Sequence, residues 1–268
     1  MIRNVLKLVA FLKRDFLSDV SYRLSFLLGF AGLFMSLAAF YFLTKMIDPN
    51  AKGLDGIRPF DWMLVGLAFQ YYFSAALNSF SDKIRNEQVL GTLEAMLVSP
   101  TPTSIVIFSS AAWDFVYGGI RVIVMLLIAT WIFGVHLHFN SMGALATGVL
   151  LTLLSSVGLG ILSASFILYF KRGNPITFFL SGMTFFFGNV FFPVAQLPEG
   201  LQGVSDYLPV NWSVRIVRGA LLQGRSFSDL DAEIVRLAVL TAVLLPLGVF
   251  CSRFAIQKAK MEGTLVQY

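Results

Sequence analysis

Few residues of this chain have the type and spacing that chemistry requires. The 268 residues include 2 His and 1 Cys, too few for a usual zinc site. His136 and His138 fall in a predicted turn, and Cys251 falls in an apolar run, so we interpret them as interfacial and packing residues. The sequence contains no phosphate-binding loop, no Ser/His/Asp set and no His-Glu-x-x-His pattern. We therefore expect no catalytic residue, no metal site and no ATP binding by the usual route in this chain.

Asp114 and Arg121 are the charged pair most open to a functional interpretation. They stand seven residues apart in an apolar stretch, which places them on one face of a helix about two turns apart. Charges within a membrane are costly and usually face protein or water. The pair could brace neighbouring helices or could lie along a substrate path, and the spacing does not decide between these roles.

The composition is that of a membrane protein. Hydrophobic residues make up 57% of the chain and charged residues 13%, and the mean hydropathy is +0.76. Soluble domains carry about 25% charged residues, so this chain could not cover a soluble core. The composition disfavours a soluble enzyme, a disulfide-stapled secreted domain and a nucleic-acid binder. The net charge of +5 suggests basic loops at an anionic membrane face.

Uncharged runs predict six membrane-spanning helices, because about 20 apolar residues cross the hydrocarbon core. The expected spans are 24–46, 62–81, 112–135, 142–169, 175–194 and 234–252. The fold class is therefore an all-α, polytopic membrane protein with one domain, 1–268. In the fourth span, Gly158 and Gly160 predict close helix packing.

The distribution of Lys and Arg predicts the orientation of these spans. With the N-terminus inside, 12 Lys and Arg residues fall on the cytoplasmic side and 6 on the outer side. Six spans place both termini on one side. We therefore expect a multi-pass protein of the cell membrane with both termini in the cytoplasm.

The N-terminal segment, residues 1–23, has an amphipathic pattern. Apolar residues recur at steps of three and four, and Arg3, Lys7 and Arg14 fall on the opposite face. This pattern predicts a helix lying in the membrane interface. It could act as an anchor for the first span, or it could also touch a cytoplasmic partner.

The inner loop, residues 82–104, carries more structure than a tight connector needs. Gly91 interrupts the helix of the second span, and Thr92 can cap a new short helix with Glu94 in its first turn. Pro100 ends that helix. The segment is either a docking element for another protein or a solvated loop on the membrane.

The outer segment, residues 195–230, is broken by prolines yet strongly apolar. Pro193 stands just before it, Pro198 and Pro209 interrupt it, and Val210 to Leu222 forms an amphipathic stretch with Arg215 and Arg218 on one face. We expect a re-entrant pair of short helices that acts as an outer gate, with both arginines directed to headgroups, water or an anionic cargo. A plain extracellular loop is the alternative.

The order of these segments resembles the permease subunit of type-2 ATP-binding-cassette (ABC) exporters over nearly the whole chain. The matching residues are Lys13-Arg14-Asp15-Phe16 and Ser21-Tyr22-Arg23; Glu87, Gly91-Thr92-Leu93-Glu94 and Ser99-Pro100; and Pro193, Leu197-Pro198, Pro209, Arg218 and Gly224. The resemblance implies that the inner loop is the coupling helix of the family. Its ATPase-coupling residues would be Arg85, Glu87, Gly91, Thr92, Leu93, Glu94, Met96 and Leu97.

The resemblance also implies partners that this chain does not contain. Two copies of a cytoplasmic ABC ATPase would hold ATP and Mg and drive a pathway formed by two permeases, the second being a copy or a paralogue. The apolar, aromatic spans suggest an amphipathic, drug-like or lipid-linked cargo moving outward. An ATP-independent channel or secondary transporter is the main alternative, with only Asp114 and Arg121 as candidate coupling charges. A membrane-embedded enzyme would need convergent polar groups that the sequence does not offer.

Overall fold

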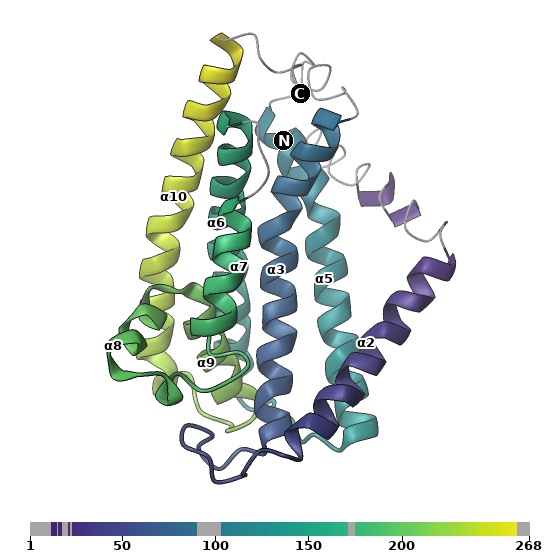
Figure 1. Ribbon diagram of the computed structural model, residues 1–268, viewed down its shortest axis with the longest axis vertical. Coiled ribbons are helices and arrows are strands. Elements are labelled where there is room, and N and C mark those ends of the chain that lie inside the picture. The colour runs from purple at the N-terminus through teal and green to yellow at the C-terminus, as the bar shows by residue number, and fades with distance from the viewer. Residues whose placement is uncertain are drawn as a thin grey trace.

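The computed structural model describes residues 12–14, 16–17, 21, 23–89, 103–170 and 175–261. Across these ranges the regular structure is helical, with no strand, which confirms the predicted all-α class. Long helices form the bundle in Figure 1: α2 (Arg23–Thr44), α3 (Pro59–Val89), α5 (Thr103–Phe133), α6 (Met142–Phe170) and α10 (Asp231–Met261). Shorter elements complete it: α7 (Pro175–Phe187), η1 (Val194–Gln196), α8 (Glu199–Gln202), η2 (Gly203–Tyr207), α9 (Pro209–Leu221) and η3 (Ser228–Leu230).

Four of the described helices are long and apolar enough to cross a membrane. The qualifying stretches are Leu27–Thr44, Ala112–Phe133, Met142–Ile167 and Ser228–Lys258. They coincide with the first, third, fourth and sixth predicted spans. The second predicted span lies in α3, which is long but more polar, and the fifth lies in α7, which is short.

Helix α3 owes its polarity to its place in the bundle. It packs against α5 and α6 and also contacts α2, α7 and α9, so protein surrounds much of it (Figure 1). Two of its polar side chains donate hydrogen bonds within the helix: the amide of Asn78 to the carbonyl oxygen of Ser74 at 2.8 Å, and Gln70 to the hydroxyl of Ser74 at 3.3 Å. A helix enclosed in this way needs less apolar surface than one that faces lipid.

Helix α7 ends at Phe187, before the predicted end of the fifth span at residue 194. The reason is local. Asn189 adopts a left-handed conformation with φ of 59°, which a continuing helix does not allow. A Cβ on Gly188 would lie 2.2 Å from the carbonyl oxygen of Thr184, so only glycine fits this turn. The 13 residues of α7 reach about 20 Å, less than the hydrocarbon core.

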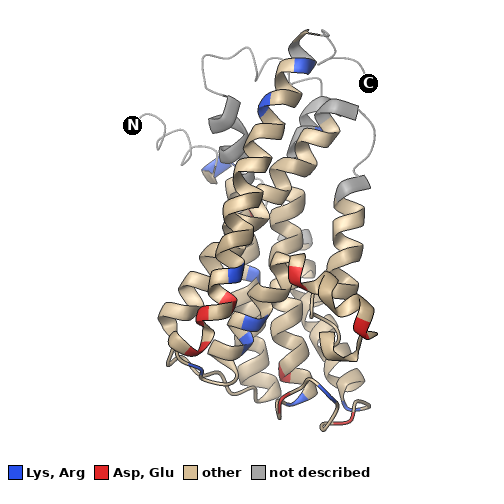
Figure 2. Ribbon diagram, turned by 90° about the vertical axis from the view of Figure 1, so that its left-hand side faces the viewer, with Lys and Arg blue, Asp and Glu red and all other residues tan. Residues whose placement is uncertain are grey.

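The helix ends gather at two opposite ends of the bundle. The end of α3 at Val89, the start of α5 at Thr103 and the end of α10 at Met261 lie at the same end of the bundle (Figure 1). The loop 45–58, helices α8 and α9 and the α5–α6 connection lie at the other end. In Figure 2 the acidic residues gather toward this second end of the bundle, whereas basic residues lie at both ends.

Glycines bring α6 and α10 into backbone contact. A Cβ on Gly248 would lie 2.5 Å from the carbonyl oxygen of Gly158, and a Cβ on Gly158 would lie 2.9 Å from the carbonyl group of Leu244. These distances leave no room for a larger residue at either position. The prediction of close packing along the fourth span is therefore confirmed at Gly158.

We expect Gly248→Val to destabilise the protein by about 1–3 kcal/mol, because the added side chain must push α6 and α10 apart. The measurement is the denaturant or thermal unfolding of the purified chain in detergent micelles. Gly182→Val in α7 is the matched control, since no atom lies within 4 Å of its added Cβ. Equal stability losses in the two variants would contradict the packing argument.

Two predicted segments lie partly outside the described residues. Of the interfacial helix 1–23, residues 12–14, 16–17 and 21 are described and are helical, and the ring of Phe16 packs edge-on against Trp113 of α5 at 5.5 Å. Arg14 is exposed, whereas Arg3 and Lys7 lie outside the described residues. In the inner loop, α3 continues through Arg85 and Glu87 as expected. The other predicted coupling residues lie outside the described residues: Gly91, Thr92, Leu93, Glu94, Met96 and Leu97.

Candidate functional site

Helix α9 is the centre of the candidate site. Pro209 stands at its first position, where its fixed φ and missing N–H suit a helix start. Just before it, the carbonyl oxygens of Ser205 and Asp206 accept hydrogen bonds from Asn211 Nδ2 at 3.1 Å and Trp212 Nε1 at 2.8 Å. All of its 13 residues except Arg215 are buried. The amphipathic stretch from Val210 is therefore helical as far as Leu221 and is enclosed by protein, unlike a solvated loop.

The side chain of Arg218 joins α9 to two other parts of the bundle. It is only 4% exposed. Its Nε donates to the carbonyl oxygen of Trp62 in α3 at 2.9 Å. Its Nη1 and Nη2 donate to the carbonyl oxygens of Asn189 and Val190, which follow α7, at 2.6 Å and 3.3 Å. The guanidinium also stacks on the Trp62 ring, 3.4 Å from its centroid. Arg218 thus provides a charged donor for carbonyl groups of the non-helical chain that follows α7.

A glycine in α3 makes room for this arrangement. A Cβ on Gly66 would lie 2.5 Å from Arg218 Nη2 and 2.6 Å from the carbonyl oxygen of Val190. Any other residue would therefore push Arg218, the chain at Val190, or both away from α3. We define the Arg218 joint as Arg218 with Trp62, Gly66, Asn189 and Val190.

Exposure to open water, one of the directions expected for the two α9 arginines, is wrong for Arg218, which is 4% exposed and bonded to backbone carbonyls. Arg215 fits the expectation, because its side chain is exposed. It stacks on the Trp212 ring at 5.0 Å from the centroid, and Arg236 of α10 stacks on the same ring at 4.6 Å. The spacing of three residues correctly placed Arg215 and Arg218 next to each other on α9. It could not show that α3 and the chain after α7 cover Arg218 and leave Arg215 exposed.

The three predicted gate prolines each stand at the start of a short helical element. Pro193 precedes η1 in an extended conformation, Pro198 precedes α8, and Pro209 opens α9. Because proline has no N–H, it fits a position where no helical hydrogen bond is required. The prolines therefore divide the outer segment into separate short helices, as expected.

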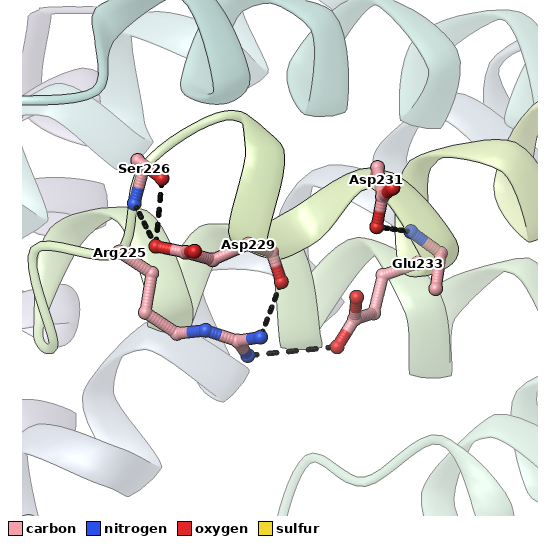
Figure 3. Close-up of polar contacts among 6 residues, drawn as sticks. Arg225, Ser226, Asp229, Asp231 and Glu233 are labelled. Atoms are coloured by element: carbon pink, nitrogen blue, oxygen red, sulfur yellow. Dashed lines mark hydrogen bonds and ion pairs between the residues drawn. The ribbon is translucent and has the colours of Figure 1, made fainter.

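Arg225, which the sequence did not single out, connects α9 to the start of α10 (Figure 3). Its Nη1 lies 3.5 Å from Glu233 Oε1, and its Nη2 donates to the carbonyl oxygen of Asp229. Its backbone N–H donates to the carbonyl oxygen of Gly219 at 2.9 Å. In the sequence, Arg225 and Glu233 are eight residues apart. Side chains in contact on one helix are three or four residues apart, so this spacing did not indicate the ion pair.

The carboxylate of Asp229 closes the turn that leads into α10 (Figure 3). It accepts hydrogen bonds from the hydroxyl of Ser226 at 2.7 Å and from the N–H of Ser226 at 2.9 Å. Asp231 and Glu233 follow in the first turn of α10, where negative charge suits the helix dipole.

A polar pocket of about 310 Å³ opens between these elements. The basic residues in its wall are Arg215, Arg218 and Arg225, and the acidic ones are Asp55 and Glu233. Further wall residues come from the loop 45–58, α3, the chain after α7, and α9: Gly53, Ile57, Trp62, Asn189, Pro193, Val194, Ala195, Gly219 and Gln223.

Arg121 in α5 connects three helices. It donates from Nη1 to the hydroxyl of Tyr71 in α3 and from Nη2 to the carbonyl oxygen of Gly29 in α2 at 3.1 Å. The rings of Tyr71 and Tyr117 lie 4.6 Å and 5.5 Å from the guanidinium. These contacts link α5 to α2 and α3, and Arg121 also lines a pocket between these three helices. Asp114 is half-buried on the same helix.

The family profile of the ABC-2 type transporter matches residues 7–222. The matched region includes residues 7–23 of the interfacial segment, the inner loop and α9. The comparison with curated proteins gave no match. Since the profile covers most of the chain and the helices fit a membrane domain, the chain belongs to the ABC-2 type transporter family, as a membrane-embedded permease.

Proposed function

We propose that this chain is the permease subunit of an ABC exporter and that its inner loop transmits ATP-driven motion from a separate ATPase. The observation that carries the proposal is the shape of α3 and α5. Each has 31 residues and is therefore about 46 Å long, roughly 15 Å more than the hydrocarbon core. Val89 and Thr103 lie at the same end of the bundle (Figure 1). The predicted coupling residues connect these two projecting ends.

The proposed assembly has two ATPase subunits, which hold ATP and Mg, and two permeases. The second permease is another copy or a paralogue. We place both termini in the cytoplasm and count six crossings, with α3 and α7 as the second and fifth. Helix α3 crosses inside protein, and the short α7 is extended by the segment that Arg218 secures.

We propose α9 and its neighbours as the outer gate. The helix contacts α3, α6, α7 and α10, so a relative movement of these helices must move α9. The Arg218 joint lies between α9 and the ends of α3 and α7. A gate there would open only when the contacts of Arg218 change.

An apolar cleft supports an amphipathic or lipid-linked cargo. The cleft has a volume of about 570 Å³ and lies between α3, α5 and α6, with Leu221 of α9 in its wall. Its wall is almost wholly apolar, with Phe69, Ile123, Leu127 and Val149 among its residues. Such a surface suits an acyl chain or another apolar group.

The test of the coupling proposal is a pair of inner-loop variants. Leu93→Ala and Glu94→Ala are each expected to reduce export and coupled ATP hydrolysis at least tenfold while the chain still inserts into the membrane. The readouts are ATP hydrolysis by the co-purified complex and the amount of ATPase that remains bound.

Matched controls remove the same side-chain types at the opposite end of the bundle. Leu201 and Glu199 of α8 are both exposed there, so Leu201→Ala and Glu199→Ala should leave the amount of bound ATPase unchanged. Full coupling in both inner-loop variants would refute the proposal.

A further inference from the structure

The polar pocket beside α9 holds a buried positive charge that no acidic side chain balances. Within the described part of the chain, no carboxylate lies at ion-pair distance from Arg218, although its side chain is 4% exposed. Backbone carbonyls accept three of its hydrogen bonds. A buried charge is costly unless it is paired, so this site favours an additional negative group.

Arg218 also retains donors for such a group. A guanidinium has five N–H groups, two of them on each Nη. The structure gives one acceptor to Nε and one to each Nη, which leaves one N–H on each Nη. Since Arg218 forms part of the pocket wall, a ligand in the pocket can approach this side chain.

The other charged residues of the pocket also favour an anion beside Arg218. Arg225 is balanced by Glu233 at 3.5 Å. Arg215 is exposed and also lines the pocket, so it can supply a second guanidinium. The other acidic residue of the pocket wall is Asp55, which belongs to the loop 45–58 and does not take part in the Arg225–Glu233 ion pair.

We propose that the pocket formed by Arg215, Arg218, Asn189 and the loop around Asp55 binds an anionic phosphate group. Guanidinium groups bind phosphate oxygens through paired N–H donors, and the volume of about 310 Å³ lies at the lower end of the range for ligand sites. The phosphate could belong to a lipid headgroup or to a soluble anion. The proposal concerns the same segment as the outer gate, but it does not depend on ATP-driven export, because the permease chain alone can be tested for binding.

The test is isothermal titration calorimetry of the full-length chain in non-ionic detergent micelles at about 0.1 M salt. One titration uses inorganic phosphate and the other uses dihexanoyl-phosphatidylglycerol, a short-chain anionic lipid. Saturable binding of inorganic phosphate would identify a soluble anion as a sufficient ligand. Binding of the lipid alone would identify a headgroup site.

Variants separate a built pocket from general surface charge. Arg215→Gln should weaken binding about tenfold, which corresponds to about 1.4 kcal/mol. Asp55→Asn should strengthen it about threefold by removing a repelling charge. Arg236→Gln is the matched control, because Arg236 is exposed and stacks on the same Trp212 ring but does not line the pocket.

Arg236→Gln should leave the affinity unchanged. The proposal is overturned if neither probe binds, or if Arg215→Gln and Arg236→Gln weaken binding equally. It is also overturned if Asp55→Asn weakens binding. None of these variants alters Arg218 itself, so the test does not depend on whether the Arg218 joint can be removed without unfolding.

Discussion

Replacing Gly66 with alanine should destabilise the protein by about 3–5 kcal/mol, a large effect for one methyl group. The added Cβ would lie 2.5 Å from Arg218 Nη2, 2.6 Å from the carbonyl oxygen of Val190 and 3.1 Å from Val190 Cα. Two of these atoms belong to the backbone and cannot rotate away. Arg218 must therefore leave its place, and the carbonyl groups of Asn189 and Val190 would lose their charged donor.

Arg218→Met should have a similar cost, since it removes the same donors and keeps much of the side-chain volume. Unfolding of the two single variants and the double variant in micelles provides a double-mutant cycle. Because both changes break one joint, the double variant should lose clearly less stability than the sum of the two single losses. Gly32→Ala in α2 is the control, because no atom lies within 4 Å of its added Cβ. Additive losses, or a Gly66→Ala protein as stable as the parent, would show that the joint does not hold α9.

The sequence predicted the helices around the Arg218 joint but not the contacts of Arg218. The run lengths of apolar residues predicted α2, α5, α6 and α10, because the hydropathy of a stretch is a local property. The apolar spacing from Val210 to Leu222 predicted α9 for the same reason. The partners of Arg218 are backbone carbonyls that lie 28, 29 and 156 residues away in the chain. A carbonyl has no side-chain identity, so no residue type could indicate this contact.

Other features of the site had signals that remained ambiguous. Asn189 is of a residue type that adopts the left-handed conformation, and it follows the end of α7 within an uncharged run. The spacing of Asp114 and Arg121 indicated a shared face but not the partners on that face. The hydroxyl of Tyr71 and the carbonyl oxygen of Gly29, which come from two other helices, give Arg121 its contacts with α3 and α2.

An all-or-none result is expected from cysteine labelling of the two ends of the bundle. The native Cys251, which lies in α10, is first replaced by serine. Lys52→Cys, in the exposed loop 45–58, should react with a membrane-impermeant maleimide in intact cells. Met261→Cys, 81% exposed at the end of α10, should react only after the membrane is permeabilised. The reagent reaches both sites in permeabilised cells, which provides the control for intrinsic reactivity.

The distribution of Lys and Arg predicts which end of the bundle faces the cytoplasm. The fold predicts that the two cysteines should differ in labelling. The predicted cytoplasmic segments carry 12 Lys and Arg residues and the outer segments carry 6, so the end with Met261 should face the cytoplasm. The loop 45–58 and the end of α10 lie at opposite ends of the bundle, so they should not react alike. Equal labelling in intact cells would contradict the membrane-spanning arrangement itself. The reverse pattern would keep the bundle across the membrane but place Val89, Thr103 and the coupling residues between them outside the cell, where no cytoplasmic ATPase could reach them.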